Sequence, residues 1–207
     1  MPGSQTQLKL AAILLAAGGS SRLGQAKQLV TIEGQPLVRR SASLLIECGF
    51  DPLLVVTGAY REMVDRALDG LEVQRIYNPD WSQGMGSSLA LAAASLEVGS
   101  VDGVLVMLAD QWDVGVPDIE RLKTGFITDI SMLSCASFQR EESTVISPPA
   151  LFPGIMIREL AKLTGDHGAK PLIGKHSART RTVELAGASS DLDTPEDLAR
   201  LRERYRM

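Results

Sequence analysis

Near the N-terminus, a short apolar run ends in a segment whose residue types suit phosphate binding. The segment from Leu14 to Lys27 reads LLAAGGSSRLGQAK, with glycines and serines followed by an arginine and a lysine. Glycines let the backbone adopt positive φ and approach a ligand closely. Backbone N–H groups of such a loop can converge on an anion, and Arg22 and Lys27 add full positive charge. The spacing therefore predicts a phosphate-binding loop, although an ordinary strand-to-helix turn with two solvated cations also fits.

The spacing of these residues excludes two common nucleotide-binding loops. Neither Ser nor Thr follows Lys27, so the segment is not a P-loop. Gly18, Gly19 and Gly24 do not form Gly-x-Gly-x-x-Gly, the loop of dinucleotide-binding dehydrogenases. An NAD(P)-dependent oxidoreductase is therefore disfavoured.

One aspartate stands where a metal ligand is expected. Asp110 follows the apolar run 101–108, which we expect to be a strand. In open α/β sheets ligands bind beyond the carboxyl ends of the strands, so Asp110 should share an edge with the first loop. Its carboxylate could cap a helix or bind Mg²⁺, which usually shares oxygen ligands with substrate phosphates. The first loop favours the metal role.

The hydrophobic pattern predicts the elements that bring these residues together. Apolar runs expected to be strands lie at 8–15, 52–57, 73–77, 101–108, 130–137 and 179–185. Stretches expected to be helices lie at 37–48, 60–68, 87–96, 116–126, 152–163 and after Thr194. This alternation predicts an α/β fold, a Rossmann-like domain with a mostly parallel sheet and helices on both faces. We expect one domain over 8–207 and a disordered segment at 1–7.

Composition narrows the class of protein. The 207 residues are 44% hydrophobic and 22% charged, enough for one domain with a full core. A net charge of −4 argues against an extended nucleic-acid surface. Cys48 and Cys135 lie in apolar surroundings, as expected for reduced thiols of a cytoplasmic protein. The apolar run 10–17 is too short to span a membrane and is not expected to be a signal peptide.

The first loop also resembles a family signature. The pattern Leu14-Leu15-Ala16-Ala17-Gly18-x-Ser20-x-Arg22-x-Gly24-x-x-Lys27 is similar to that of nucleotidyltransferases with a single Rossmann-like domain. It is most similar to the molybdenum cofactor cytidylyltransferase group. Further matches follow in order at 78–89, 109–111, 165–169 and 191–198. The resemblance implies an enzyme that uses a nucleoside triphosphate and Mg²⁺.

The resemblance also implies roles for individual residues. Arg22 and Lys27 would hold the triphosphate and act with Asp110 in catalysis, while the segment 78–89 would contact the base. The implied nucleotide-binding set is Leu15, Ala16, Ala17, Gly18, Gly19, Arg22, Lys27, Gly86, Ser87 and Ser88. Without the resemblance, Ser87 and Ser88 would be interpreted as N-cap residues of the next helix.

The later motifs imply a metal pair and an acceptor side. Asp110 and Asp193 would bind the metal, with Asp191 as the fallback, although Thr194 or Asp193 could also cap an ordinary helix that begins at Pro195. The implied acceptor contacts are Gln111, Trp112, Asp166, His167 and Lys170.

Three positions depart from the family pattern on this acceptor side. Trp112 replaces the usual proline, Ser147 replaces a glycine, and Lys170 replaces an arginine. Lysine keeps the positive charge but cannot form the two parallel hydrogen bonds that a guanidinium makes to phosphate.

These assignments predict transfer of CMP from CTP to the terminal phosphate of molybdopterin, with release of pyrophosphate. Ala17 and the loop at Trp81 resemble the cytidylyl branch more than the guanylyl branch. One alternative is a sugar or polyol phosphate as acceptor. Another is a non-catalytic chaperone that hands the pterin to an oxidoreductase. A molybdenum hydroxylase is the expected recipient, and neither nucleic acid nor a membrane is an expected partner.

Overall fold

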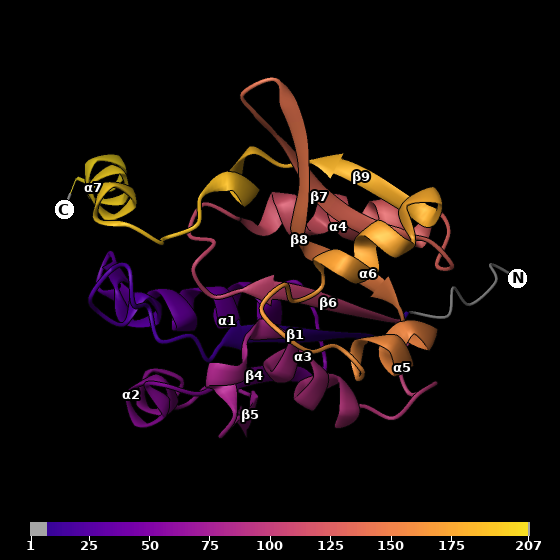
Figure 1. The fold of residues 1–207 in the computed structure, drawn as a ribbon, viewed down its shortest axis with the longest axis horizontal. Coiled ribbons are helices and arrows are strands. Elements are labelled where there is room, and N and C mark those ends of the chain that lie inside the picture. Colours follow the sequence, from indigo (N-terminus) through magenta and orange to yellow (C-terminus); the bar gives the residue numbers. More distant parts are fainter. Residues whose placement is uncertain (1–7, 207) are drawn as a thin grey trace, which may run out of the picture.

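A seven-stranded sheet forms the centre of the molecule, in the order β5-β4-β1-β6-β8-β7-β9 (Figure 1). The computed structural model describes residues 8–206, so the expectation of a disordered segment 1–7 lies outside the described residues. Strand β8 pairs antiparallel with β6 and β7, and the other neighbours pair in parallel. The strands are β1 (Leu10–Ala16), β4 (Leu53–Thr57), β5 (Gln74–Tyr77), β6 (Gly103–Leu108), β7 (Leu133–Arg140), β8 (Ser143–Pro153) and β9 (Thr180–Glu184).

Strand β1 is buried on both faces because helices cover both sides of the sheet. Its alternate residues enter two separate hydrophobic clusters, as the pleat of a strand requires. Leu14 packs with one layer of helices: α1 (Leu37–Glu47), α2 (Arg61–Ala67) and α4 (Val116–Ile127). Ile13 packs with the other: α3 (Met85–Ala94), α5 (Ile157–Leu160) and α6 (Lys170–Lys175). The predicted mostly parallel sheet with helices on both faces is confirmed.

A third hydrophobic cluster lies apart from these two layers and holds the C-terminal helix α7 (Pro195–Arg204). Thr194 caps α7 as predicted, because its hydroxyl accepts from the Asp197 N–H while its own N–H donates to the Asp197 carboxylate at 2.7 Å. A two-stranded ribbon, β2 (Thr31–Ile32) and β3 (Gln35–Pro36), packs beside it. The third cluster consists of Ile32, Leu37, Trp112, Leu192, Leu198 and Leu201.

Some predicted element boundaries are wrong. The helix predicted at 152–163 is replaced at its start by β8, because Phe152 pairs with Val104 of β6, and the short α5 follows. The strand predicted at 130–137 runs instead from Leu133 to Arg140. Helix α3 begins at Met85 with Gly84 as its N-cap, so Ser87 and Ser88 lie inside the helix and do not cap it.

Within residues 8–206, no helix is both long enough and apolar enough to cross a membrane.

Gly154 provides a test of the packing where β8 ends. A Cβ at this position would overlap the carbonyl oxygen of Val101, a backbone atom that cannot rotate away. We expect Gly154→Ala to lower the free energy of unfolding by about 1–3 kcal/mol, the usual cost of overpacking. Urea unfolding measures this change.

Gly174 is the matched control, because it lies in α6 and a Cβ there would meet nothing within 4 Å. Gly174→Ala should leave stability unchanged or raise it by up to about 1 kcal/mol, as Gly→Ala does in helices. Equal stability of the two variants would contradict the close approach at Gly154.

Candidate active site

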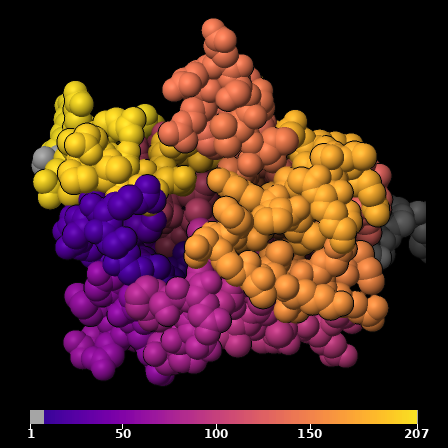
Figure 2. Space-filling model, viewed as in Figure 1, coloured from indigo at the N-terminus to yellow at the C-terminus, as the bar shows by residue number. Residues whose placement is uncertain are grey.

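The parallel pairing of β1 and β6 places the predicted residues at one edge of the sheet. Leu15 lies opposite Leu108, so the loop after β1 and Asp110 after β6 start side by side. A pocket of about 300 Å³, called here the first pocket, opens at this edge. Figure 2 shows this face of the molecule hollowed between the indigo, magenta and orange segments.

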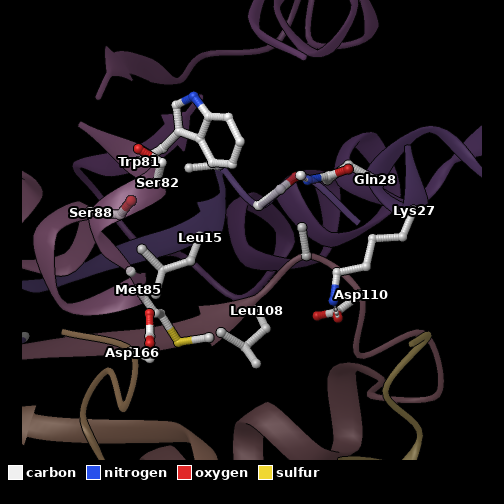
Figure 3. Close-up of a pocket in the computed structure, with 15 residues that line it drawn as sticks. Leu15, Lys27, Gln28, Trp81, Ser82, Met85, Ser88, Leu108, Asp110 and Asp166 are labelled. Carbon is white, nitrogen blue, oxygen red and sulfur yellow. Dashed lines mark hydrogen bonds and ion pairs between the residues drawn. The ribbon is translucent and has the colours of Figure 1, made fainter. Parts of the chain in front are cut away.

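Two glycine-containing segments wall the first pocket (Figure 3). Trp81 packs against the first loop so closely that a Cβ at Gly19 would come within 3.0 Å of its ring. A Cβ at Gly58 would come within 2.7 Å of the Trp81 Cβ, so glycine is required there. Backbone and apolar walls of this kind suit a small ligand that a few polar groups orient. The predicted residues that line the pocket are Leu15, Ala17, Gly18, Gly19, Lys27, Ser88, Asp110 and Asp166.

Gln28 fixes the shape of the first loop from inside. Its side chain is only 2% exposed, and its Nε2 donates to the carbonyl oxygens of Ala16 at 3.0 Å and Gly18 at 2.7 Å. The neighbouring Lys27 N–H donates to Ser20 Oγ at 3.1 Å. Gln28 is absent from the predicted set because nothing in its spacing distinguishes a buried glutamine from a solvated one.

The charged residues meet where the first pocket ends. The Lys27 ammonium forms an ion pair with Asp110, and its Nζ lies 2.9 Å from Asp193 Oδ1. The exposed Arg22 reaches the same Asp193 carboxylate at 2.8 Å. Burial lowers the pKa of Lys27, but Asp110 and Asp193 outweigh burial and raise it overall, so the ammonium stays charged. The structure thus brings together Arg22, Lys27, Asp110 and Asp193.

A third carboxylate, Asp191, faces this cluster. Its Oδ1 is buried and has no hydrogen-bond partner in the part of the chain that the structure describes. Burial, together with the charges of Asp110 and Asp193, raises the pKa of Asp191 to about 7. Because Lys27 and Arg22 already pair with Asp110 and Asp193, Asp191 is the carboxylate of this cluster without a partner among the described residues, and a bound cation would favour its charged form.

The donor set fits a hard cation such as Mg²⁺. Asp110 and Asp193 offer carboxylate oxygens at the edge where phosphates are expected, and Asp191 adds an unsatisfied one. Over residues 8–206, however, no group of three or more His, Cys, Asp or Glu side chains is already arranged to hold a metal. The Lys27 ammonium pairs with both Asp110 and Asp193, so a cation must share or replace those contacts.

A second pocket of about 280 Å³ adjoins the first and contains the predicted acceptor residues of the 164–170 loop. The start of α3 holds this loop in place, because the Gly86 N–H donates to the Gly165 carbonyl at 2.8 Å. Ser147, one of the departures from the family pattern, also lines the second pocket. Residues common to the two pockets are Lys27, Met85, Leu108, Asp110 and Asp166, and the second adds Arg22, His167, Lys170, Asp191 and Asp193.

Three residues of the predicted nucleotide-binding set do not line either pocket. Ala16 is buried in β1, and Gly86 packs against the backbone of the 164–165 turn. Ser87 Oγ donates to the Gly84 carbonyl at 2.8 Å and accepts from Asn78 Nδ2 at 2.9 Å. These residues shape the backbone around the first pocket.

Gln111 and Trp112, predicted as acceptor contacts, also lie outside the linings of the two pockets. Gln111 is 1% exposed, and its Nε2 donates to the Pro148 carbonyl at 2.7 Å. Trp112 is buried in the third cluster. The structure therefore gives both side chains internal contacts, and their contact with an acceptor stays a prediction.

Several known proteins are similar to this chain over most of its length. Nicotine blue oxidoreductase of Paenarthrobacter nicotinovorans is 29% identical, with 91% of this chain and 94% of that protein covered. Molybdenum cofactor cytidylyltransferase of Escherichia coli (strain K12) is 25% identical, with 93% and 95% covered. The structure of Rv0371c from Mycobacterium tuberculosis H37Rv aligns with a TM-score of 0.79 at 25% identity, covering 96% of this chain and 100% of that one. Another structure of Rv0371c is a complex with manganese.

The model of the MobA-like NTP transferase domain matches residues 12–180, which is most of the chain. This match confirms the family resemblance and covers the first loop and the motifs at 78–89, 109–111 and 165–169, whereas the motif at 191–198 lies outside the matched residues. The chain belongs to the MobA-like NTP transferase domain family and is an enzyme of the nucleotidyltransferase type.

Proposed function

We propose that this enzyme transfers CMP from CTP to the terminal phosphate of molybdopterin and releases pyrophosphate, with Mg²⁺ as the cofactor. The observation that carries the proposal is the position of the Lys27–Asp110 ion pair, which belongs to the linings of both pockets. A group at the junction of two pockets can act on two substrates at once. Nucleotide in the first pocket and acceptor in the second would meet there.

The reaction is a displacement at the α-phosphorus. An oxygen of the acceptor phosphate forms a bond to the α-phosphorus, while the bond to the oxygen that bridges the α- and β-phosphates breaks. Such a displacement requires positioning and charge neutralisation more than a protein nucleophile. Lys27, Arg22 and the N–H groups of the first loop would hold the β- and γ-phosphates. His167 and Lys170, exposed in the second pocket, would face the acceptor phosphate.

Asp110 and Asp193 are the proposed ligands of Mg²⁺, with Asp191 beside them. When bound, the cation would offset the charge of the phosphates around the α-phosphorus. Binding of the triphosphate supplies an alternative partner for Lys27, which would free the two carboxylates from their ion pairs with the ammonium.

The choice of substrates rests on the resemblance in the first loop and on the relative named molybdenum cofactor cytidylyltransferase, 25% identical over nearly its whole length. Another phosphorylated acceptor would use the same residues. A chaperone would not need the triphosphate-binding lysine and both carboxylates. The relative named an oxidoreductase favours redox chemistry as a second candidate, but the first loop lacks the glycine spacing of dinucleotide-binding dehydrogenases.

A pyrophosphate-release assay distinguishes these candidates. Each of the four ribonucleoside triphosphates is supplied with Mg²⁺, with and without molybdenum-loaded molybdopterin, and sugar and polyol phosphates serve as alternative acceptors. Release with CTP that requires the pterin supports the proposal. Release that requires a sugar or polyol phosphate instead would keep the proposed reaction and change only the identity of the acceptor. Tight pterin binding without release would favour the chaperone, and oxidation of NAD(P)H with a pigment substrate would favour the oxidoreductase.

Removal of the Lys27 ammonium should abolish most of the activity. We expect Lys27→Ala to lower kcat by about 10²–10³-fold, the usual cost of losing one electrostatic contact to the transition state. The exposed Lys162, outside both pockets, is the control, and Lys162→Ala should keep wild-type activity. Wild-type turnover by Lys27→Ala, in a folded protein, would contradict the phosphate-binding role.

The proposed metal pair gives a separate prediction. Asp110→Asn keeps the side-chain size but removes the charge, so activity that depends on Mg²⁺ should be lost. The matched control is Asp69→Asn, because Asp69 pairs with Arg75 of the edge strand β5 at 3.1 Å, away from the site. Activity is measured against Mg²⁺ concentration and after addition of EDTA. Wild-type activity that EDTA leaves unchanged would contradict the metal assignment.

A further inference from the structure

Trp112 stands at a point where the chain departs from its family pattern, and its surroundings suggest what it does. Its side chain is 8% exposed, and its ring meets that of Tyr205 edge to face, with the centroids 6.0 Å apart. The guanidinium of Arg204 lies 5.9 Å from the centroid of the Trp112 ring and also pairs with Asp113 at 2.8 Å. Trp112 thus joins the segment after β6 to the end of α7.

Both ends of this connection lead back to the proposed metal ligands. On one side, the Trp112 N–H donates to the Asp110 carbonyl at 3.0 Å. On the other side, α7 begins two residues after Asp193, and the Asp193 N–H donates to the Asp197 carboxylate at 3.1 Å. Leu192 donates its N–H to the same Asp110 carbonyl at 3.3 Å.

Leu192 shows how the third cluster orients the carboxylates. Its side chain is fully buried in that cluster beside Trp112. While Leu192 enters the cluster, its neighbours Asp191 and Asp193 line the second pocket together with Lys27. Figure 2 shows the yellow C-terminal segment lying directly against the indigo segment that carries the first loop.

We propose that Trp112 and Tyr205 are positioning residues of the active site. Their contact holds α7 against the segment after β6, and so sets the separation of Asp193 from Asp110. This inference rests on the proposed function, because Asp110 and Asp193 are its proposed metal ligands. Neither aromatic side chain lines the two pockets, so their effect passes through the backbone.

The test compares Tyr205→Ala with Tyr205→Phe in the full-length protein. Phenylalanine keeps the ring and loses only the hydroxyl, which accepts a hydrogen bond from Arg40 at 3.4 Å. Calorimetry measures Mn²⁺ binding in the presence of a CTP analogue with a methylene group between the α- and β-phosphates. We expect Tyr205→Ala to bind Mn²⁺ about tenfold more weakly than the wild type, because loss of a residue that supports metal ligands lowers metal affinity by about this factor. Tyr205→Phe should bind Mn²⁺ as the wild type does.

Two further measurements separate positioning from general destabilisation. The affinity for the analogue without metal should be unchanged in Tyr205→Ala, and raising the Mg²⁺ concentration should restore its kcat. Trp112→Phe, which keeps a smaller ring in the cluster, should bind Mn²⁺ with an affinity between those of Tyr205→Ala and the wild type. This variant tests the positioning role if Tyr205→Ala does not fold.

The outcomes that overturn the inference differ from those that overturn the function. Wild-type Mn²⁺ affinity in Tyr205→Ala, or equal weakening in Tyr205→Phe, would overturn the positioning role alone. Absence of Mn²⁺ binding by the wild type with the analogue would overturn the metal pair of the proposed function, and the inference with it.

Discussion

The ion pairs of Lys27 with Asp110 and Asp193 are the interaction on which the candidate site depends. Each partner comes from a different part of the chain: the loop after β1, the end of β6, and the approach to α7. Asp110 is 4% exposed, and a buried carboxylate without a partner is costly in free energy. The ammonium therefore stabilises the closed arrangement of three segments, and the same charges are the ones that phosphates and a divalent cation would use.

This arrangement follows from the way the sheet is buried. Because helices cover both faces, the carboxyl ends of the parallel strands are where loops can gather polar groups without breaking the core. Strand β1 is apolar on both sides and cannot carry chemistry itself. The loop after β1 can carry polar and charged groups. Gln28 gives that loop a fixed shape, because its side chain donates hydrogen bonds to carbonyl groups where the strand ends.

The sequence predicts the parts of this structure that depend on local pattern. The apolar run of β1, the glycines and cations after it, and Asp110 at the end of β6 are local features, and the fold expected from them is confirmed. Contacts between segments that are distant in the sequence cannot be predicted from the local pattern. Phe152 belongs to a strand because it pairs with Val104, and Trp112 is buried because α7 returns to it. The family resemblance indicated Asp193, but only the fold places its carboxylate beside Lys27.

The two adjoining pockets explain how one domain can serve relatives with different names. Under the proposed function, the first pocket is built from the β1 loop and the start of α3, while the second is built from the middle of β8, the 164–170 loop and the approach to α7. Lys27 and Asp110 line both pockets. Changes such as Ser147 and Lys170 alter the second pocket without touching Gly18, Gly19 or Trp81. Under the proposed function, the acceptor could therefore change while the triphosphate site and the displacement at the α-phosphorus stay the same.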